Sequence, residues 1–193
     1  MDLTELIELM KKRWTARKFG SRKVSDKDLE TILEAGRWAP SGGNKQPWEL
    51  VVIRDEEIKE KIAQLYSNAM GLDKPSERYT SPSILIAVCI DTRTMDSYPD
   101  MMPAEFITYA GIGAMVQNMS LAAALMGIVM SWGTQPIGIH DELKKLLSLP
   151  DYMYIPDILQ VGYPAQERYL TGRREVDEFA HHDEMDETNL REF

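Results

Sequence analysis

The chain has 193 residues and a formal net charge of −9, with 44% hydrophobic and 27% charged residues. This length suits one domain with its own core, and the composition excludes a chain that is disordered over most of its length. The negative charge argues against nucleic acid or an anionic membrane as the main partner. The one cysteine, Cys89, excludes a disulfide framework and, inside an apolar run, is expected to be a small core side chain.

The first residues include acids where a signal peptide would be basic, and polar residues interrupt the longest apolar stretch, residues 109–126. Polar groups are costly in lipid, so a buried helix is expected there rather than a membrane span. These two features favour a cytoplasmic protein.

Short apolar repeats and capping residues define the first half of the chain. Ser25 and Asp28 have the spacing of a capping box, and Asp55 can cap a further helix. The predicted elements are a helix ending near residues 11–13, a helix over 26–38, a strand over 48–54, a helix from 55 to about 70 and a strand over 83–90.

The second half is organised around a helix predicted over residues 105–126. It is apolar on nearly every side, which is typical of a helix at the centre of a fold or in an oligomer interface. Gly111 and Gly113 resemble the start of a dinucleotide-binding motif, but the third glycine and a preceding strand are missing, so they indicate close helix packing. The other predicted elements are a loop or lid over 91–103, a strand over 128–132, a helix over 140–148 and a strand over 155–163.

Two further features concern the last strand and the tail that follows it. Pro156 indicates that the last strand lies at a sheet edge or begins near it, because proline cannot donate to a ladder. After residue 164 the chain is polar and acidic, and His181 and His182 in this tail are more typical of a solvated surface than of a metal site. No metal ligands are assigned.

Two segments stand out as candidates for ligand binding. Arg13 and Arg17 flank a threonine, and two guanidiniums with a hydroxyl and backbone amides suit a phosphate, although plain surface charge is the alternative. Residues 40–48 combine glycines with Asn44 and Gln46, whose amides both donate and accept, which suits a planar heterocycle. An ordinary helix-to-strand connection is the alternative there.

Four motifs in order make the chain resemble the FMN-dependent nitroreductases, a family that includes nitroreductases, flavin reductases and deiodinase-like enzymes. The match covers nearly the whole chain. The motifs are Arg-Trp-Thr-Ala-Arg-Lys-Phe at 13–19, Ala-Pro-Ser-Gly-Gly-Asn-Lys-Gln-Pro-Trp at 39–48, Gln-Asn at 117–118 with the Leu-Ala-Ala-Ala and Gly-Ile that follow, and Gly-Tyr-Pro-Ala at 162–165 with Arg173.

The resemblance implies an α/β (α+β) sandwich with a mixed, mostly antiparallel sheet flanked by helices, assembled as an intertwined homodimer. Residues 1–193 would be one FMN-binding domain, with a C-terminal extension from about residue 165 that wraps the partner chain. FMN would bind at the dimer interface, and NADH or NADPH would be the co-substrate.

The resemblance also assigns the cofactor-binding residues. Arg13 and Arg173 would hold the phosphate, Trp14 and Thr15 would contact the phosphate and ribityl region, and Arg17 would face the pyrimidine edge. The partner chain would supply Pro40, Ser41, Gly42 and Asn44, and the backbone of Trp132, Gly133 and Thr134 would lie near the ring and its N5. No catalytic side chain is assigned, because the cofactor itself is the reactive group.

The sequence departs from the family at three places, and each bears on the substrate. Lys74 or Arg78 could supply a further basic group at the pyrimidine edge, or neither could. Residues 174–178 replace the family's Pro-Leu-Glu-Glu, and the lid over 91–103 is short and rich in methionine.

Three functions therefore remain open at this stage. The first is an FMN-dependent NAD(P)H oxidoreductase that passes hydride in ping-pong fashion to a small-molecule acceptor such as a nitroaromatic or a quinone. The second is a specialised flavin enzyme, a reductive dehalogenase or a flavin-fragmenting type. The third is a flavin-binding protein without turnover.

Overall fold

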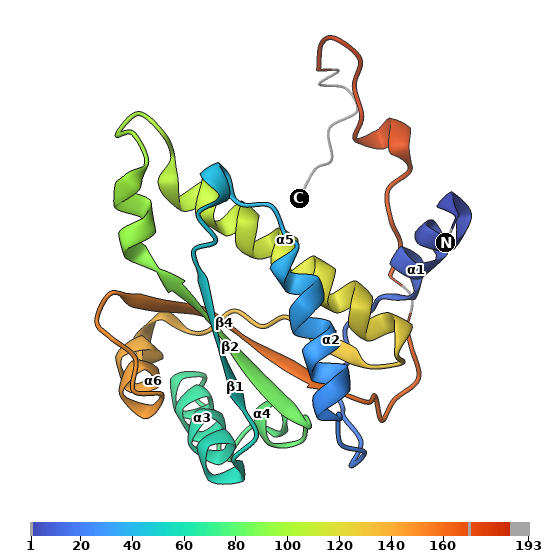
Figure 1. The fold of residues 1–193 in the computed structure, drawn as a ribbon. Helices are drawn as coiled ribbons and strands as arrows, with labels where there is room; N and C mark the ends of the chain where they lie inside the picture. Colours follow the sequence, from blue (N-terminus) through green and yellow to red (C-terminus); the bar gives the residue numbers. More distant parts are fainter. Residues whose placement is uncertain (1, 170, 186–193) are drawn as a thin grey trace.

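An antiparallel sheet forms the middle layer of the protein, seen here in a computed structural model that describes residues 2–169 and 171–185 (Figure 1). Within that part of the chain it has four strands in the order β1-β2-β4-β3, and every neighbouring pair is antiparallel. The expected antiparallel character is confirmed. The strands are β1 (Trp48–Ile53), β2 (Ile84–Asp91), β3 (Val129–Ser131) and β4 (Met153–Gly162).

Helices cover both faces of this sheet (Figure 1). The α-helices are α1 (Leu3–Lys12), α2 (Asp26–Arg37), α3 (Glu56–Ala69), α4 (Glu77–Thr80), α5 (Ala104–Leu125) and α6 (His140–Leu146). Four 3-10 turns are described as well: η1 (Gly42–Asn44), η2 (Thr92–Ser97), η3 (Ile137–Ile139) and η4 (Val176–Glu178). The helices predicted from the sequence are all present, whereas the single turn α4 was not predicted.

The alternating side chains of β2 divide the core in two. Ile86 and Val88 pack with α2 and α5 on one face, while Leu85 and Cys89 pack with α3, α4 and α6 on the other. Both faces of a strand are buried in such a sandwich, which explains its unbroken apolar run. Cys89 is the core side chain that was expected, and burial raises the pKa of its thiol to about 12.

Local capping sets the ends of the helices. The Ser25 hydroxyl accepts from the Asp28 backbone N–H at 3.1 Å, and the Asp55 carboxylate accepts from the Ile58 N–H at 2.9 Å. Only the Ser25 half of the predicted capping box is found in the described residues. At the end of α5, Gly127 has a φ of +70°, a left-handed conformation that suits glycine and terminates the helix.

Pro156 is placed differently from the expectation. β4 begins at Met153 and lies between β2 and β3, so Pro156 is neither at its start nor on an edge strand. The pairing of β4 with β2 shifts register between Val88 and Ile90, and Pro156 lies at this bulge. A bulge is the other place in a sheet where proline is tolerated, because ladder hydrogen bonds are interrupted there.

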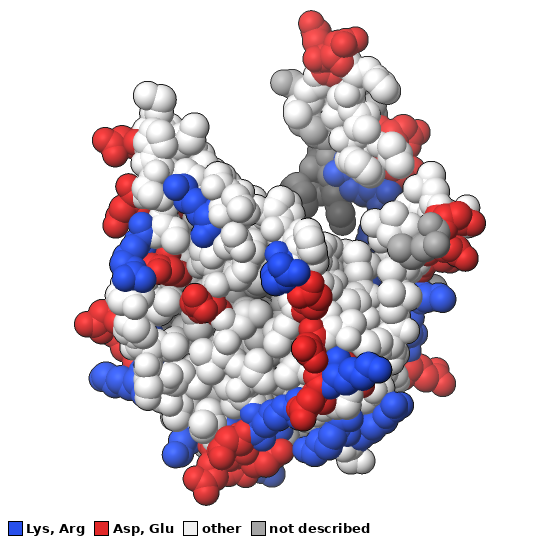
Figure 2. Space-filling model, viewed as in Figure 1, with Lys and Arg blue, Asp and Glu red and all other residues white. Residues whose placement is uncertain are grey.

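The outer side of α5 is uncharged from Phe106 to Leu125. Phe106 is 78% exposed and Leu125 is 67% exposed. Figure 2 shows a column of charged side chains down the middle of this view, where α2 lies, and further charges at the sides and the lower edge, with largely uncharged surface between them. No helix among residues 2–169 and 171–185 is long and apolar enough to cross a membrane.

The segment after β4 returns toward the N-terminal helix (Figure 1). Gln166 Oε1 accepts from the backbone N–H groups of Arg17 and Lys18 at 2.9 and 2.8 Å, and the Ala165 N–H donates to the Lys18 carbonyl at 3.0 Å. This return places the tail beside residues 13–17. The predicted extension lies partly outside the described residues, at 170 and 186–193.

Candidate functional site

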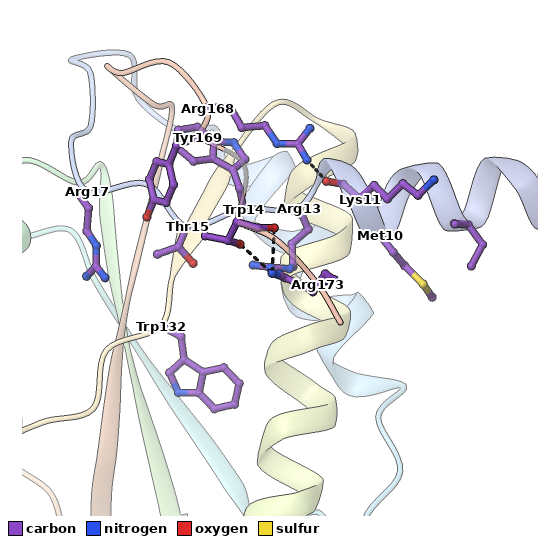
Figure 3. A pocket seen from close by; sticks show the side chains of 12 residues that line it. Met10, Lys11, Arg13, Trp14, Thr15, Arg17, Trp132, Arg168, Tyr169 and Arg173 are labelled. Carbon is purple, nitrogen blue, oxygen red and sulfur yellow. Dashed lines mark hydrogen bonds between the residues drawn. The ribbon is translucent and has the colours of Figure 1, made fainter. Parts of the chain in front are cut away.

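A cavity of about 640 Å³ opens where the end of α1, the residue after β3 and the C-terminal segment meet (Figure 3). Its size falls in the range of small-molecule sites. Its wall combines aromatic rings with cations. The lining residues are Ile7, Met10, Lys11, Arg13, Trp14, Thr15, Arg17, Trp132, Arg168, Tyr169, Thr171 and Arg173.

The segment from Arg13 to Arg17 is fixed by backbone contacts on both sides. The Arg13 N–H donates to the Leu9 carbonyl at 3.2 Å and closes α1, and Gln166 binds the chain at Arg17. Ala16 is buried against Phe19 and Val129, and Trp14 packs against the same cluster, which anchors the segment at the edge of the cavity. The structure therefore brings together four of the predicted residues, Arg13, Trp14, Thr15 and Arg17.

The C-terminal segment supplies the opposite wall. Figure 3 shows Arg173 beside Arg13, with Trp132 on the far side of the cavity. The Arg173 Nη1 donates to the Thr171 hydroxyl at 2.7 Å, which holds the guanidinium close to its own backbone. The guanidinium of Arg174 instead lies over the Phe179 ring at 5.7 Å. Arg173, and not Arg174, is therefore among the described residues that line this cavity, together with Arg168 from the same segment.

The cavity is strongly cationic. Lys11, Arg13, Arg17, Arg168 and Arg173 all line it, and the described lining includes no acidic side chain. Burial lowers the pKa of Arg13, and the charges of Arg173 and Arg168 lower it further. Like charges held together repel one another, and an anion bound among them would relieve that repulsion. The arrangement therefore fits a phosphate-bearing ligand.

Of the three residues predicted after β3, the structure places one in the wall of the cavity. Trp132 lines the cavity, whereas Gly133 is buried and Thr134 is paired with Asp157 in an isolated β-bridge. An alanine Cβ at Gly133 would lie 1.9 Å from Arg78 Nη2, so the Arg78 guanidinium packs directly on this backbone. Arg78 also donates to Gln160 Oε1 at 3.3 Å, while Lys74 is exposed.

The remaining predicted residues, Pro40, Ser41, Gly42 and Asn44, are not among the described residues that line this cavity. They surround η1 beside the first half of α5: an alanine Cβ at Gly42 would lie 2.3 Å from Ile107 Cγ2. By contrast, Arg13 shares a smaller cavity with Ser120 in the second half of α5. The two groups of predicted residues thus lie along different halves of α5.

The loop around η1 has an unusual backbone. Gly43, Asn44 and Gln46 have φ values of +58°, +53° and +46°, and such conformations are uncommon for side chains other than glycine and asparagine. The Tyr98 hydroxyl donates to the Gly42 carbonyl at 2.9 Å, and the Ser41 hydroxyl accepts from the Gln46 N–H at 2.9 Å. These bonds hold the loop while leaving the Asn44 side chain exposed.

Sequence reasoning missed several residues at the site. Lys11, Arg168 and Tyr169 line the cavity, and Tyr169 packs edge-on against Trp14 with ring centroids 6.0 Å apart. A signal for the last two exists, since an arginine and a tyrosine stand together five residues before Arg173. Asp157, a buried acid inside the apolar strand β4, was also missed.

The match to known proteins agrees with this geometry. The sequence model of the nitroreductase family matches residues 10–163. The chain belongs to the nitroreductase family. Within residues 2–169 and 171–185, no group of three or more His, Cys, Asp or Glu residues is placed to hold a metal ion.

Similar proteins come from archaea and bacteria. A protein of Archaeoglobus fulgidus, provisionally named an NADH dehydrogenase/NAD(P)H nitroreductase, is 30% identical over 86% of this chain and 89% of its own length. An iodotyrosine deiodinase of Thermotoga neapolitana is 27% identical over 89% of this chain and 95% of its own. The NADPH:FMN oxidoreductase of Vibrio harveyi, solved with NAD+, has a TM-score of 0.79 and 25% identity over 94% of this chain and 78% of its own. The nitroreductase fold is thereby shown.

Proposed function

We propose that this protein is an FMN-dependent NAD(P)H oxidoreductase acting on nitroaromatic, quinone or related acceptors. The observation that carries the proposal is the group of arginines from two distant segments around an aromatic-walled cavity. In a chain of net charge −9, such a group is typical of a site for an anionic ligand. The name of the Vibrio harveyi neighbour supports FMN as that ligand.

The residues of the cavity can be assigned to the parts of FMN. Arg13 and Arg173 would bind the phosphate, because their guanidiniums lie side by side (Figure 3). Trp14 and Thr15 would contact the phosphate and ribityl chain, and Arg17 would face the pyrimidine edge. Bound FMN would supply the hydride and electron transfer from NAD(P)H to the acceptor.

Trp132, Gly133 and Thr134 would lie beside the flavin ring. The Gly133 carbonyl accepts from the Ile158 N–H at 3.3 Å, so this segment is fixed to β4. A fixed backbone near the ring orients the cofactor without reorganisation during the reaction. Arg78 is the better candidate for an added positive charge at this place, because it packs on Gly133 whereas Lys74 is exposed.

The site would be completed by a second copy of the chain. The partner's loop would supply its own Pro40, Ser41, Gly42 and Asn44, because in one chain these residues lie along the other half of α5. In a two-fold dimer the same surface of each chain contacts its copy. If the uncharged side of α5 forms this contact, the first half of α5 in one chain lies beside the second half of α5 in the other. The extension from residue 165 would wrap the partner, and we propose a cytoplasmic homodimer.

Reductive dehalogenation is the second candidate. The similarity to iodotyrosine deiodinases from bacteria and animals favours it over other specialised flavin chemistry. The segment over 91–103, which includes η2, is where a substrate-specific lid was predicted. A flavin-binding protein without turnover remains the non-enzymatic alternative.

The absorbance spectrum of the purified protein tests the proposal. We expect yellow protein with flavin bands that bleach rapidly on addition of NADH or NADPH, and that recover when a nitroaromatic or quinone is added. Bands that do not bleach would indicate the non-enzymatic alternative. Recovery with a halogenated phenol but not with the other acceptors would indicate dehalogenation, and a failure to bind FMN would contradict the proposal.

A further inference from the structure

Asp157 is a buried acid that the cavity and the motifs leave unexplained. It lies in the middle of β4 and is 4% exposed. Its Oδ1 is buried without a hydrogen-bond partner among the described residues. Burying a carboxyl group without hydrogen-bond partners lowers the stability of the fold, so a specific role for Asp157 is expected.

The chain after β3 is attached to β4 on both sides of Asp157. The Gln135 N–H donates to the Pro156 carbonyl at 3.0 Å, and the Ile158 N–H donates to the Gly133 carbonyl at 3.3 Å. Between these bonds, Thr134 pairs with Asp157 itself. This arrangement places residues 132 and 134 on the same side of the segment as the Asp157 carboxyl, since side chains alternate along a strand.

Trp132 and Thr134 supply hydrogen-bond donors on the side of the segment that faces Asp157. Burial raises the pKa of Asp157, and hydrogen bonding from Trp132 and Thr134 opposes the rise. Burial is the main cause of the raised pKa of Tyr79 and of Tyr109, and the charge of Asp157 adds to the rise in both.

Trp132 connects Asp157 to the candidate site. Its ring lines the cavity and is 47% exposed, so packing restrains only part of it. On its inner side the ring lies over α5 at Gly113, 3.7 Å from where a Cβ would be. An indole held by one packed edge keeps a single orientation when its N–H also has an acceptor. The Asp157 carboxyl lies on the same side of the segment, and its Oδ1 has no other partner among the described residues, so it is placed to accept from this N–H.

We propose that Asp157 is a positioning residue, whose buried carboxyl holds the Trp132 indole and the Thr134 hydroxyl and so fixes the wall of the cavity after β3. Asp157 itself does not line the described cavity and acts through these two side chains. The consequence for FMN rests on the proposed function, whereas the orientation of Trp132 does not.

The first experiment uses FMN-free protein and therefore tests the positioning alone. Acrylamide quenching of tryptophan fluorescence is measured for the wild type and for Asp157→Ala, and the Trp132 part is obtained by subtracting the signal of Trp132→Phe made in each background. We expect stronger quenching of Trp132 in Asp157→Ala, because the ring is released. Asp157→Asn keeps an acceptor of the same shape and should fall between the two. Asp151→Asn, in the exposed turn before β4, is the matched control and should match the wild type.

The second experiment measures FMN affinity in the same variants. Losing a hydrogen bond to a charged group should weaken FMN binding about tenfold in Asp157→Ala. If Asp157 acts through Trp132, Asp157→Ala should add little to the loss caused by Trp132→Phe. If Asp157→Ala does not fold, the comparison of Asp157→Asn with Asp151→Asn carries the test.

Unchanged Trp132 quenching in the folded Asp157 variants would overturn the proposal, and so would full additivity with Trp132→Phe in FMN affinity. If the wild type does not bind FMN at all, the proposed function fails. The quenching result still decides the role of Asp157 in that case.

Discussion

Arg13 and Arg173 stand 160 positions apart in the sequence, and their guanidiniums lie beside one another in the same cavity. Their mutual repulsion contributes to lowering the pKa of Arg13. Holding two cations together lowers the stability of the fold. Such a pair is expected where a bound anionic ligand supplies the opposing charge.

Replacing Asn44 should separate its backbone role from its side-chain role. Its φ of +53° is tolerated by glycine but strained for alanine. We expect Asn44→Gly to keep the unfolding free energy nearly unchanged and to weaken FMN binding several-fold, because one neutral hydrogen bond contributes about 0.5–1.5 kcal/mol. Asn44→Ala should show the same loss of binding and about 1 kcal/mol lower stability. Isothermal titration and urea unfolding measure the two effects, and wild-type binding by Asn44→Gly would show that the side chain does not reach the flavin.

A charge placed on the outer side of α5 should prevent dimer formation. Ala110 is exposed within the uncharged stretch of α5, and Ala110→Glu would bury an unpaired carboxylate if two copies pack there. We expect a dimer mass for the wild type and a monomer for Ala110→Glu by light scattering at micromolar concentration. Ala69→Glu, at the exposed end of α3, is the control and should stay dimeric. A monomeric wild type would refute the proposed assembly.

His140 should make the stability depend on pH. Its ring is stacked on Tyr154 with centroids 4.5 Å apart, and neither ring nitrogen has a hydrogen-bond partner among the described residues. Burial lowers the pKa of His140 below its ordinary 6.5, Asp141 opposes this and Lys144 adds to it. The unfolded chain therefore takes up the proton first, so stability that is present above about pH 6.5 is lost as the pH falls toward the folded pKa.

The variant His140→Phe keeps a stacked ring and removes this titration. Measured by urea unfolding from about pH 8 to about pH 5.5, the wild type should lose stability relative to the variant as the pH falls. A constant difference between the two proteins over this range would show that His140 does not contribute.

Gly133 should tolerate no side chain while Arg78 is in place. An alanine Cβ would lie 1.9 Å from Nη2 and 2.8 Å from Cζ of Arg78, so the guanidinium would have to leave Gln160. We expect Gly133→Ala to lower the unfolding free energy by about 1–3 kcal/mol, as overpacking does. In the Arg78→Ala background the same change should cost clearly less. Gly138→Ala, which meets nothing within 4 Å, is the control, and equal losses in both backgrounds would contradict the contact.

Much of the fold could be predicted from local pattern. Ser25 and Asp55 mark helix starts that the structure confirms, and the all-round apolar segment over 105–126 is the central helix. These features depend on neighbours within a few residues, which the sequence displays directly. The turn α4 was missed because Pro75 and Pro82 bracket only a few residues, too few for a helical period to be visible.

The site could be predicted only in part, because it is built by contacts between distant segments. Arg13 and Arg173 were found through motifs, whereas Arg168 lines the cavity because Gln166 ties the tail to residues 17 and 18. Asp157 reads as an isolated acid in the sequence, and its contact with Thr134 appears only once residues 133–135 lie against β4. Non-local pairing of this kind leaves no periodic signal.

The most direct test of the account is the titration of FMN and of riboflavin against the wild type, Arg13→Ala and Arg173→Ala. A guanidinium–phosphate pair contributes about 1.5–3 kcal/mol, so each substitution should weaken FMN binding about ten- to a hundredfold. Arg174→Ala, whose guanidinium lies over Phe179, is the matched control and should bind FMN like the wild type. Riboflavin, which lacks the phosphate, should bind all four proteins with nearly the same affinity. Equal losses for FMN and riboflavin in the Arg13 and Arg173 variants, or wild-type FMN affinity in both, would contradict the account.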